Sequence, residues 1–392
     1  MTDTAGMELR LYRPGDWENV HAFIKANWRD DHPFSKKALF DWQFGGFGNE
    51  EGRIGSVLLF HEGALIGFRG VIPGLYQVPD EKGGTTVFPG GSLALWMIRE
   101  DYRGKGLASV MHREAQSRMQ VITGAGSHPK TSVPVYLKFG FTLLETMNRY
   151  VVPLEAEGYR RLLPGEVPPG EIEDWSATVR KFGGGVDPCT PDVERLGAHW
   201  KETTFPLRIF SLFRNAGFWK WRYVESAGFR YLFFGDVRQS GAVVARIEKI
   251  HGAEDNSLNG RRVLRIIEIV PADGRAWQGK EDPALGALLQ GVLRWGIDHE
   301  CLAADFHCTN GRFFPTLKSA GFRRQDFKEG PPECNLAHLF QPFRFVTRPI
   351  NALYHIEIPG RGLVKPDFEE THMVKSENDM DRPNVYDFEG LL

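Results

Sequence analysis

The feature that most constrains this chain is a short glycine-containing loop between an apolar strand and an amphipathic helix. Residues 93–98 are rich in Leu, Ala, Trp and Ile, and the segment from Leu107 carries apolar residues at helical spacing. Residues 103–108, with the sequence RGKGLA, join the two. Glycines allow a sharp turn and a close approach of a ligand to the backbone. Because the first amides of a helix lack intrahelical acceptors and lie at the positive end of its dipole, the sequence predicts a pyrophosphate site here.

Two common phosphate-binding motifs do not describe this loop. The GxxxxGK[ST] spacing of a P-loop is absent, and a dinucleotide-binding GxGxxG would need glycine where Ser109 stands. The loop therefore belongs to another class of anion site.

The loop and a later segment together resemble the GNAT superfamily of acyl-CoA-dependent N-acyltransferases. Arg103, Gly106 and Ala108 satisfy the family's pyrophosphate signature R/Q-x-x-G-x-G/A. About 30 residues further on, residues 136–141 (YLKFGF) are similar to its Y-x-x-x-G-F motif. The resemblance implies acetyl-CoA or another acyl-CoA as co-substrate, with no metal.

The resemblance also implies roles for individual residues. The backbone of Met97 and Ile98 would pair with the pantetheine arm, and Tyr136 would protonate the leaving thiolate. Alternatively, Tyr136 is a helix residue packed on the sheet. The pyrophosphate would be held by the amides of Arg103, Gly104, Lys105, Gly106, Leu107 and Ala108.

The general base and the acceptor site are less defined. The strand at residues 93–98 offers no carboxylate. His128 lies just beyond a strand expected at 119–125, and we consider it as the base, although a lone histidine is more often structural. Asp31 and His32 lie between the two early helices, where the family binds its acceptor. They also fit a solvated loop.

The chain resembles itself at two landmarks. Trp42 and Trp221 lie 179 residues apart, and the Gly-Phe pairs that begin at Gly140 and Gly321 lie 181 apart. Nearly equal offsets indicate an internal duplication. We therefore expect an α/β fold made of two tandem GNAT-like domains, each a mixed central sheet flanked by helices.

The second block lacks the features that carry chemistry in the first. No R/Q-x-x-G-x-G/A stands between Val270 and Leu285, and Leu317 occupies the place of Tyr136. We expect a degenerate domain that forms a wall of the acceptor pocket. Trp221 and Arg222 would line that pocket or belong to the core.

Breaks in composition predict four segments. They are a first domain at 8–152, a Pro- and Gly-rich connector at 153–204, a second domain at 205–360 and an acidic tail at 361–392. The polar stretch 379–384 either folds over a site or belongs to a mobile tail.

Composition narrows the possible partners. A net charge of −2 and a pI near 6.7 give no reason to expect nucleic acid or an anionic membrane. There is no signal-like N-terminus, no apolar run of about 18 residues and no CxxC among the four cysteines. We expect a cytoplasmic protein, with its oligomeric state undetermined. Cys301 and Cys308 fit structural thiols better than a metal site.

These features together predict an N-acyltransferase that moves an acyl group, most simply from acetyl-CoA, to a primary amine. A small-molecule acceptor is expected, and an amino sugar of a polysaccharide pathway is one candidate by analogy. The alternatives are an acyltransferase for a peptide amine and a non-catalytic acyl-CoA-binding or scaffolding module.

Overall fold

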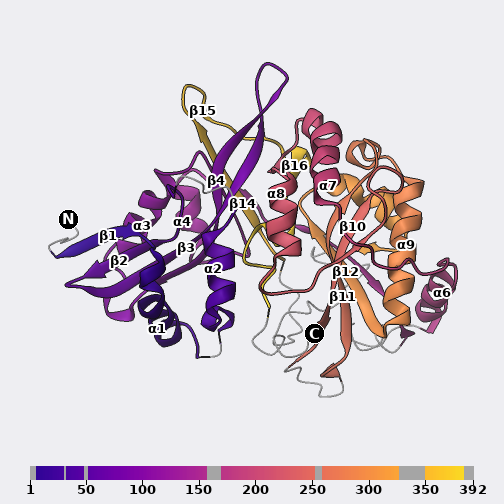
Figure 1. Ribbon diagram of the computed structural model, residues 1–392, viewed down its shortest axis with the longest axis horizontal. Helices are drawn as coiled ribbons and strands as arrows, with labels where there is room; N and C mark the ends of the chain where they lie inside the picture. The colour runs from indigo at the N-terminus through magenta and orange to yellow at the C-terminus, as the bar shows by residue number, and fades with distance from the viewer. Residues whose placement is uncertain are drawn as a thin grey trace.

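The fold contains two mixed β-sheets flanked by helices, as expected for the α/β class (Figure 1). The computed structural model describes residues 6–30, 32–47, 52–156, 169–251, 258–325 and 349–383. Asp31, the residues around Cys334 and the end of the tail beyond Pro383 lie outside these ranges.

The first sheet starts as an antiparallel meander and then changes direction. Its first strands are β1 (Met7–Leu11), β2 (Val57–His61), β3 (Ala64–Pro79) and β4 (Thr85–Ile98), and β5 (Val121–Ala125) runs parallel to β4. The turn between β2 and β3 contains Glu62 and Gly63 at φ 50° and 78°. Two positive φ values are what a tight two-residue hairpin turn requires.

Helices cover both faces of this sheet at the places that the periodicity predicts. On one face, α1 (Trp17–Asn27) and α2 (Lys37–Gly45) bury Phe23, Phe40 and Phe44 against the sheet. On the other face, α3 (Leu107–Gln116) and α4 (Val133–Lys138) bury Leu107, Met111 and Tyr136. The loop at residues 103–108 therefore leads directly from β4 into α3.

The second sheet repeats the order of the first. Its strands run β13 (Arg323–Arg324), β7 (Asn148–Pro153), β12 (Cys301–Cys308), β11 (Arg262–Val270), β10 (Ala242–Lys249) and β9 (Leu232–Phe234). β11 and β12 are parallel, as β4 and β5 are. The helices α9 (Pro283–Asp298) and α10 (Phe314–Ser319) occupy the places of α3 and α4 in the order of elements.

The two sheets exchange one strand each. β7 follows the first half of the chain but lies in the second sheet, antiparallel to β12 and β13. β14 (Ala352–Ile358), from the far end of the chain, lies in the first sheet between β5 and β6 (Thr142–Leu144). In the sheet β14 therefore follows β5 and is separated by it from β4. Neither sheet is thus contiguous in sequence, and the boundaries 8–152 and 205–360 remain a prediction.

Trp42 and Trp221, one of the two landmark pairs behind the predicted duplication, contact each other where the halves join. Trp42 Nε1 donates to the Trp221 carbonyl at 2.8 Å, and Trp221 Nε1 donates to the Trp42 carbonyl at 3.0 Å. Their rings stack with centroids 5.4 Å apart. This reciprocal contact joins the two halves, and the internal duplication that the offset indicates stays a prediction.

None of the described helices is long and apolar enough to cross a lipid bilayer.

The connector and the end of the chain also contain regular structure. The remaining elements are α6 (Pro169–Arg180), α7 (Val193–His199), α8 (Ala216–Trp219), β8 (Phe210–Leu212), β15 (Gly362–Leu363) and β16 (Thr371–His372).

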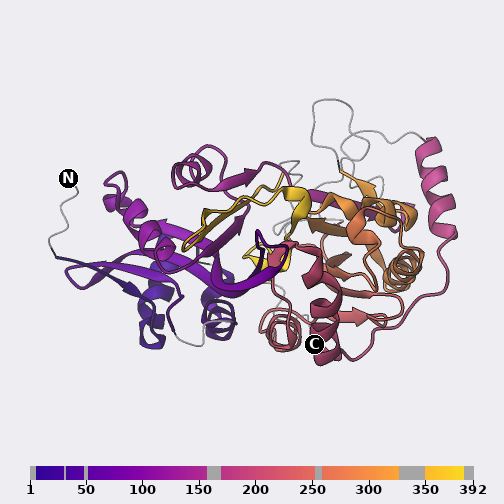
Figure 2. The same ribbon diagram turned by 90° about the horizontal axis from the view of Figure 1, so that it is seen from above.

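Residues 371–383, here called the C-terminal strap, are packed into the protein. Ser376, Asn378 and Asp381 are each at most 3% exposed. In Figure 2 the yellow end of the chain lies at the centre, between the two halves. Of the two alternatives for the predicted tail, the described part therefore follows the folded one.

Candidate functional site

Strands β4 and β5 separate after a short paired stretch. They pair only where Gly90, Gly91 and Ser92 face residues 121–123. This close pairing requires glycine, since a Cβ on Gly90 would lie 2.3 Å from the Val121 carbonyl oxygen. Beyond Ser92, β4 continues along β3 alone as far as Ile98. The edge of β4 that contains Met97 and Ile98 is thereby left without β5 as a hydrogen-bonding neighbour.

The loop after β4 contains a row of backbone amides without backbone acceptors among the described residues. Gly104 and Gly106 both have φ 77°, a conformation that favours glycine. Among the described residues, no carbonyl accepts from the amides of Gly104 through Ala108, and α3 has no side-chain cap. Five successive amides without acceptors at the start of a helix are able to bind an anion, and the pyrophosphate site at this loop stays a prediction.

Basic side chains lie beside these amides. Arg103 and Lys105 are exposed, and Arg103 Nε donates to the Ile98 carbonyl at 3.1 Å. The Lys105 ammonium lies 4.7 Å from the centre of the Tyr102 ring. Both positive charges add to the helix dipole, so the loop attracts a polyanion more strongly than the amides alone.

Tyr136 is held by a buried arginine. Its hydroxyl accepts a hydrogen bond from Arg69 Nη2 at 2.7 Å. Arg69, on β3, is fully buried, donates to the Ala94 carbonyl on β4 at 2.9 Å and lies 4.6 Å from the Trp96 ring centre. Because the guanidinium donates, the phenol keeps its own hydrogen for another acceptor beside the open part of β4.

A second titratable side chain, His112 on α3, packs against Tyr136. Its ring centre lies 5.5 Å from that of Tyr136 and 4.5 Å from that of Phe139. Within the described chain neither ring nitrogen has a partner. Burial lowers the pKa of His112 to about 2, with Arg69 acting in the same direction, so the ring is neutral. The sequence analysis missed both His112 and Arg69, since neither belongs to a recognisable motif.

The predicted general base lies apart from this cluster. His128 is exposed, and its carbonyl accepts from the amides of Ser132 and Val133 at the start of α4. Its role as a base stays a prediction. His32 is buried against His21 and Trp28, with ring centres 5.4 and 6.3 Å away, and Asp31 is outside the described residues.

Trp221 and Arg222 lie at the junction between the halves. Trp221 contacts Trp42 as described above. Arg222 is buried, its guanidinium lies 4.8 Å from the Trp42 ring centre, and Nη2 donates to the Asp381 carbonyl at 3.1 Å. Both side chains thus have structural contacts, and substrate binding by them stays a prediction.

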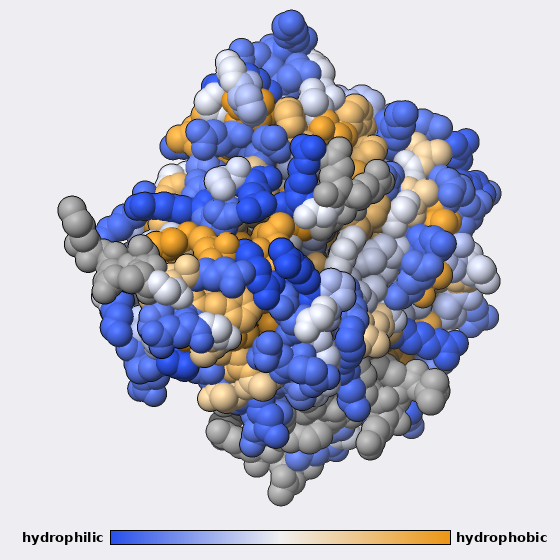
Figure 3. All heavy atoms as spheres, turned by 60° about the vertical axis from the view of Figure 1, so that its left-hand side comes forward, coloured by the Kyte–Doolittle hydropathy of each residue, from blue (hydrophilic) through white to orange (hydrophobic). Residues whose placement is uncertain are grey.

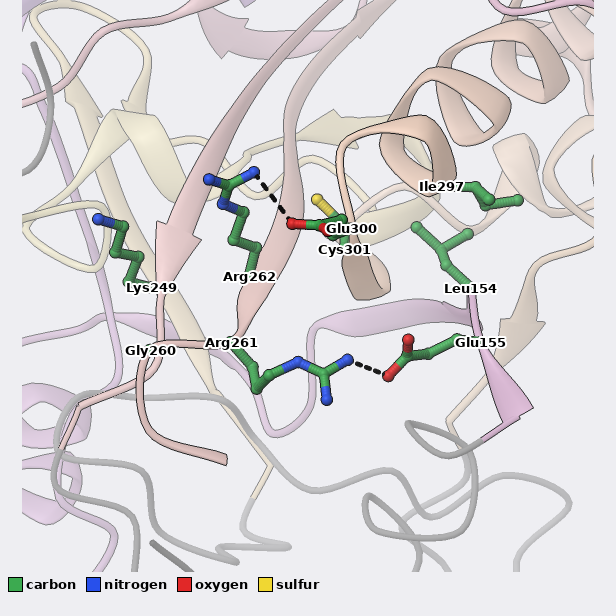
Figure 4. A pocket seen from close by; sticks show the side chains of 9 residues that line it. All are labelled: Leu154, Glu155, Lys249, Gly260, Arg261, Arg262, Ile297, Glu300 and Cys301. Atoms are coloured by element: carbon green, nitrogen blue, oxygen red, sulfur yellow. Dashed lines mark hydrogen bonds and ion pairs between the residues drawn. The ribbon is translucent and has the colours of Figure 1, made fainter. Parts of the chain in front are cut away.

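Two hollows in the structure are lined by different parts of the chain. The larger, of about 510 Å³, lies at the end of the second sheet, where Arg261 pairs with Glu155 and Arg262 with Glu300 (Figure 4). It contains no residue of the loop at 103–108 or of α4. The smaller, of about 250 Å³, here called the junction hollow, has walls from both halves and from the strap. It is lined by Trp28, Arg29, Arg246, Glu248, Arg265, Lys375, Asp379, Met380, Arg382 and Pro383.

The two cysteines considered as metal ligands are far apart. Cys301 and Cys308 stand at opposite ends of β12, so their Cα atoms are separated by roughly 23 Å. They cannot bind one ion, and burial raises the pKa of Cys301 to about 12.

Solved structures of N-acyltransferases share this fold. Saccharomyces cerevisiae N-myristoyltransferase with bound myristoyl-CoA is 11% identical and superposes with a TM-score of 0.53, covering 89% of this chain and 78% of that one. A GCN5-related N-acetyltransferase from Kribbella flavida gives a TM-score of 0.51 at 12% identity, covering 89% and 72%. A probable N-acyltransferase from Enterococcus faecalis V583 gives 0.50 at 12% identity with the same coverage.

These likenesses establish the fold class. The chain has the GNAT fold that the loop and the Tyr136 segment predict. The sequence matches no protein family and no curated protein.

Proposed function

We propose that this protein is an N-acyltransferase that takes its acyl group from an acyl-CoA. The observation that carries the proposal is the row of amides from Gly104 to Ala108 at the start of α3, for which the described part of the chain offers no acceptor. It lies directly after the part of β4 that β5 leaves open, in a GNAT fold. A pyrophosphate on the amides and an amide-containing arm along β4 would satisfy both sets of backbone groups.

Tyr136 is suited to assist the departure of the thiolate. As the C–S bond of the thioester breaks, the sulfur gains negative charge and needs a proton. The phenol hydrogen has no acceptor among the described residues, and the Arg69 guanidinium stabilises the negative charge left on the phenol oxygen. The pair thereby combines a hydroxyl donor with a fixed positive charge.

The acceptor is proposed to be a primary amine. A small molecule such as an amino sugar and the amine of a peptide fit the fold equally well. Apolar side chains gather between polar bands on the face of the first half that Figure 3 brings forward, and they offer contacts for either class. A non-catalytic acyl-CoA-binding module is the remaining alternative.

The decisive experiment separates binding from turnover. The melting temperature is measured with acetyl-CoA, myristoyl-CoA and CoA, because a ligand that binds the folded state stabilises it. Thiol release is then followed with a panel of amino sugars, nucleotide-linked amino sugars and peptides. A melting shift with amine-dependent thiol release supports the enzyme. A melting shift without thiol release supports the binding module. No melting shift with acetyl-CoA, myristoyl-CoA or CoA overturns the proposal.

A further inference from the structure

The C-terminal strap is fixed by a buried ion cluster. Asp381 accepts from Tyr231 at 2.6 Å, from Arg246 Nη2 at 2.9 Å and from Arg222 Nη2 at 3.3 Å. Burial alone would raise the pKa of Asp381, but Arg246 and Arg222 lower it to about 2. The strap is therefore anchored to the second half at physiological pH, two residues away from Asp379.

The same strap reaches the open end of the first sheet. The sulfur of Met380 packs on the backbone of Gly126, where an added Cβ would lie 2.5 Å from it. Gly126 directly follows β5. Met380 and Asp379 thus place the junction hollow beside the strand that parts from β4.

Electrostatics connect the hollow with Tyr136. Burial raises the pKa of Asp379, and the positive charge of Arg69 opposes this rise. Arg69 in turn donates to the Tyr136 hydroxyl. One arginine therefore donates to the proton donor proposed for the thiolate and also acts electrostatically on a carboxylate of the hollow.

Asp379 is the strap carboxylate that a ligand in the hollow can reach. Its side chain is 14% exposed, and it forms an ion pair at 2.8 Å with Arg382, whose side chain is 30% exposed. Glu248, the other carboxylate of the lining, is bound by both Arg246 and Arg265. Burial raises the pKa of Asp379, while Arg382 and Arg69 oppose the rise, which makes it a better proton acceptor than an ordinary aspartate.

We propose that the junction hollow receives the amine end of the acceptor and that the Asp379 carboxylate accepts the proton that the amine must lose. This inference rests on the proposed function. The charges of Arg29, Arg246 and Arg382 in the lining disfavour an ammonium ion relative to a free amine, while Arg382 also favours the charged form of Asp379. The same surroundings act on Lys375, where burial, together with Arg265, lowers the pKa to about 7.

In the proposed reaction the ammonium nitrogen loses two protons. An ammonium gives one proton to Asp379, which passes it to solvent, and the free amine attacks the thioester carbonyl carbon. The C–N bond forms, the C–S bond breaks, and the thiolate takes a proton from Tyr136. The second proton of the attacking nitrogen then restores the phenol. The products are an amide, a thiol and one proton in solution.

The test compares two amines that differ in charge. Near neutral pH ethylamine is an ammonium ion, whereas hydroxylamine is uncharged and needs no base before it attacks. Thiol release from acetyl-CoA is measured with each amine for the wild type, Asp379→Asn and Asp379→Glu. The control is Asp298→Asn, which removes the aspartate of the exposed Arg294–Asp298 pair at the end of α9.

The expected result is a selective loss. Asp379→Asn lowers the rate with ethylamine by roughly 100-fold and leaves hydroxylamine within about twofold of wild type, while Asp379→Glu restores part of the ethylamine rate. Asp298→Asn behaves as wild type. An equal loss with both amines, or no loss with either, overturns the role of Asp379.

Failure of the two proposals can be distinguished in the same experiment. A wild type whose melting temperature rises with acetyl-CoA but which releases thiol with neither amine contradicts the amine site and leaves acyl-CoA binding standing. A wild type whose melting temperature rises with none of acetyl-CoA, myristoyl-CoA and CoA contradicts the proposed function itself.

Discussion

Helices α3 and α9 occupy the same place in the two sheets but begin in different ways. α3 starts after Gly106, without a side-chain cap and with open amides before it. α9 starts after the buried Asp282, whose carboxylate accepts from the Leu285 amide at 3.0 Å, and Pro283 follows with no amide hydrogen to donate. The second half thus satisfies the start of its helix with its own carboxylate, whereas the first half leaves that place for an anion from outside.

The difference shows how one fold can serve two purposes. The start of any helix needs acceptors for its free amides, and these come from the protein or from a ligand. A self-capped helix is stable without a partner and cannot bind a phosphate there. An open start forgoes about 1 kcal/mol of capping but creates a binding site. One acyl-CoA site per chain is therefore expected.

The largest expected effect of a substitution is at Tyr136, whose counterpart in α10 is the buried Leu317. Tyr136→Phe removes the proposed acid and should lower kcat by roughly 100-fold or more. The shift of the melting temperature with acetyl-CoA should persist, because the amides of the loop are untouched. Tyr150→Phe, at a buried tyrosine of β7, is the control. Wild-type turnover by Tyr136→Phe would exclude the acid role.

A carboxylate placed in the open loop should make the first half resemble the second. Nothing lies within 4 Å of a Cβ added at Gly104, so the side chain fits in space, although φ 77° strains it. Gly104→Asp should weaken acyl-CoA binding by about tenfold or more through repulsion of the pyrophosphate. Gly104→Asn has the same shape and strain without the charge, and it separates the two effects. Titration calorimetry with acetyl-CoA gives both dissociation constants, and equal values would contradict an anion at this loop.

His112 allows a test of stability on the first half alone. Its pKa is about 2 in the folded protein and about 6.5 in the unfolded chain, so the unfolded state binds more protons between these values. The histidine therefore lowers the free energy of unfolding as pH falls below about 6.5, by up to about 1.4 kcal/mol per pH unit. His112→Leu should flatten that part of the profile. Urea unfolding of both proteins between pH 7 and pH 5 measures the difference, and parallel profiles would show that His112 is not held neutral.

Local features of the site could be predicted from sequence, and distant partners could not. The strand, loop and helix around residues 103–108 are adjacent in the chain, so periodicity and glycine spacing were sufficient. The exchange of β7 and β14 leaves no such trace, because a strand pattern does not say which sheet the strand joins. Arg69 is a single charged residue within a strand, and its role depends on its hydrogen bond to Tyr136, 67 residues further along the chain.

The strap illustrates the same limit. Its sequence is polar and acidic, which is typical of a mobile tail. It is buried because Arg222, Tyr231 and Arg246 provide partners for Asp381 from 135 to 159 residues away. The compensation of buried charge is a property of the assembled fold and is invisible to composition.

The smallest expected effect belongs to the capped helix of the second half. Asp282→Ala removes the side-chain acceptor at the start of α9 and should lower the free energy of unfolding by about 1 kcal/mol. Asp282→Asn retains an acceptor oxygen and should remain close to wild type. Neither variant should change the melting shift with acetyl-CoA, since the proposed site lies at α3. If Asp282→Ala instead acquired a second acyl-CoA site by calorimetry, the missing glycine loop would be unimportant, and the carboxylate alone would distinguish the two halves.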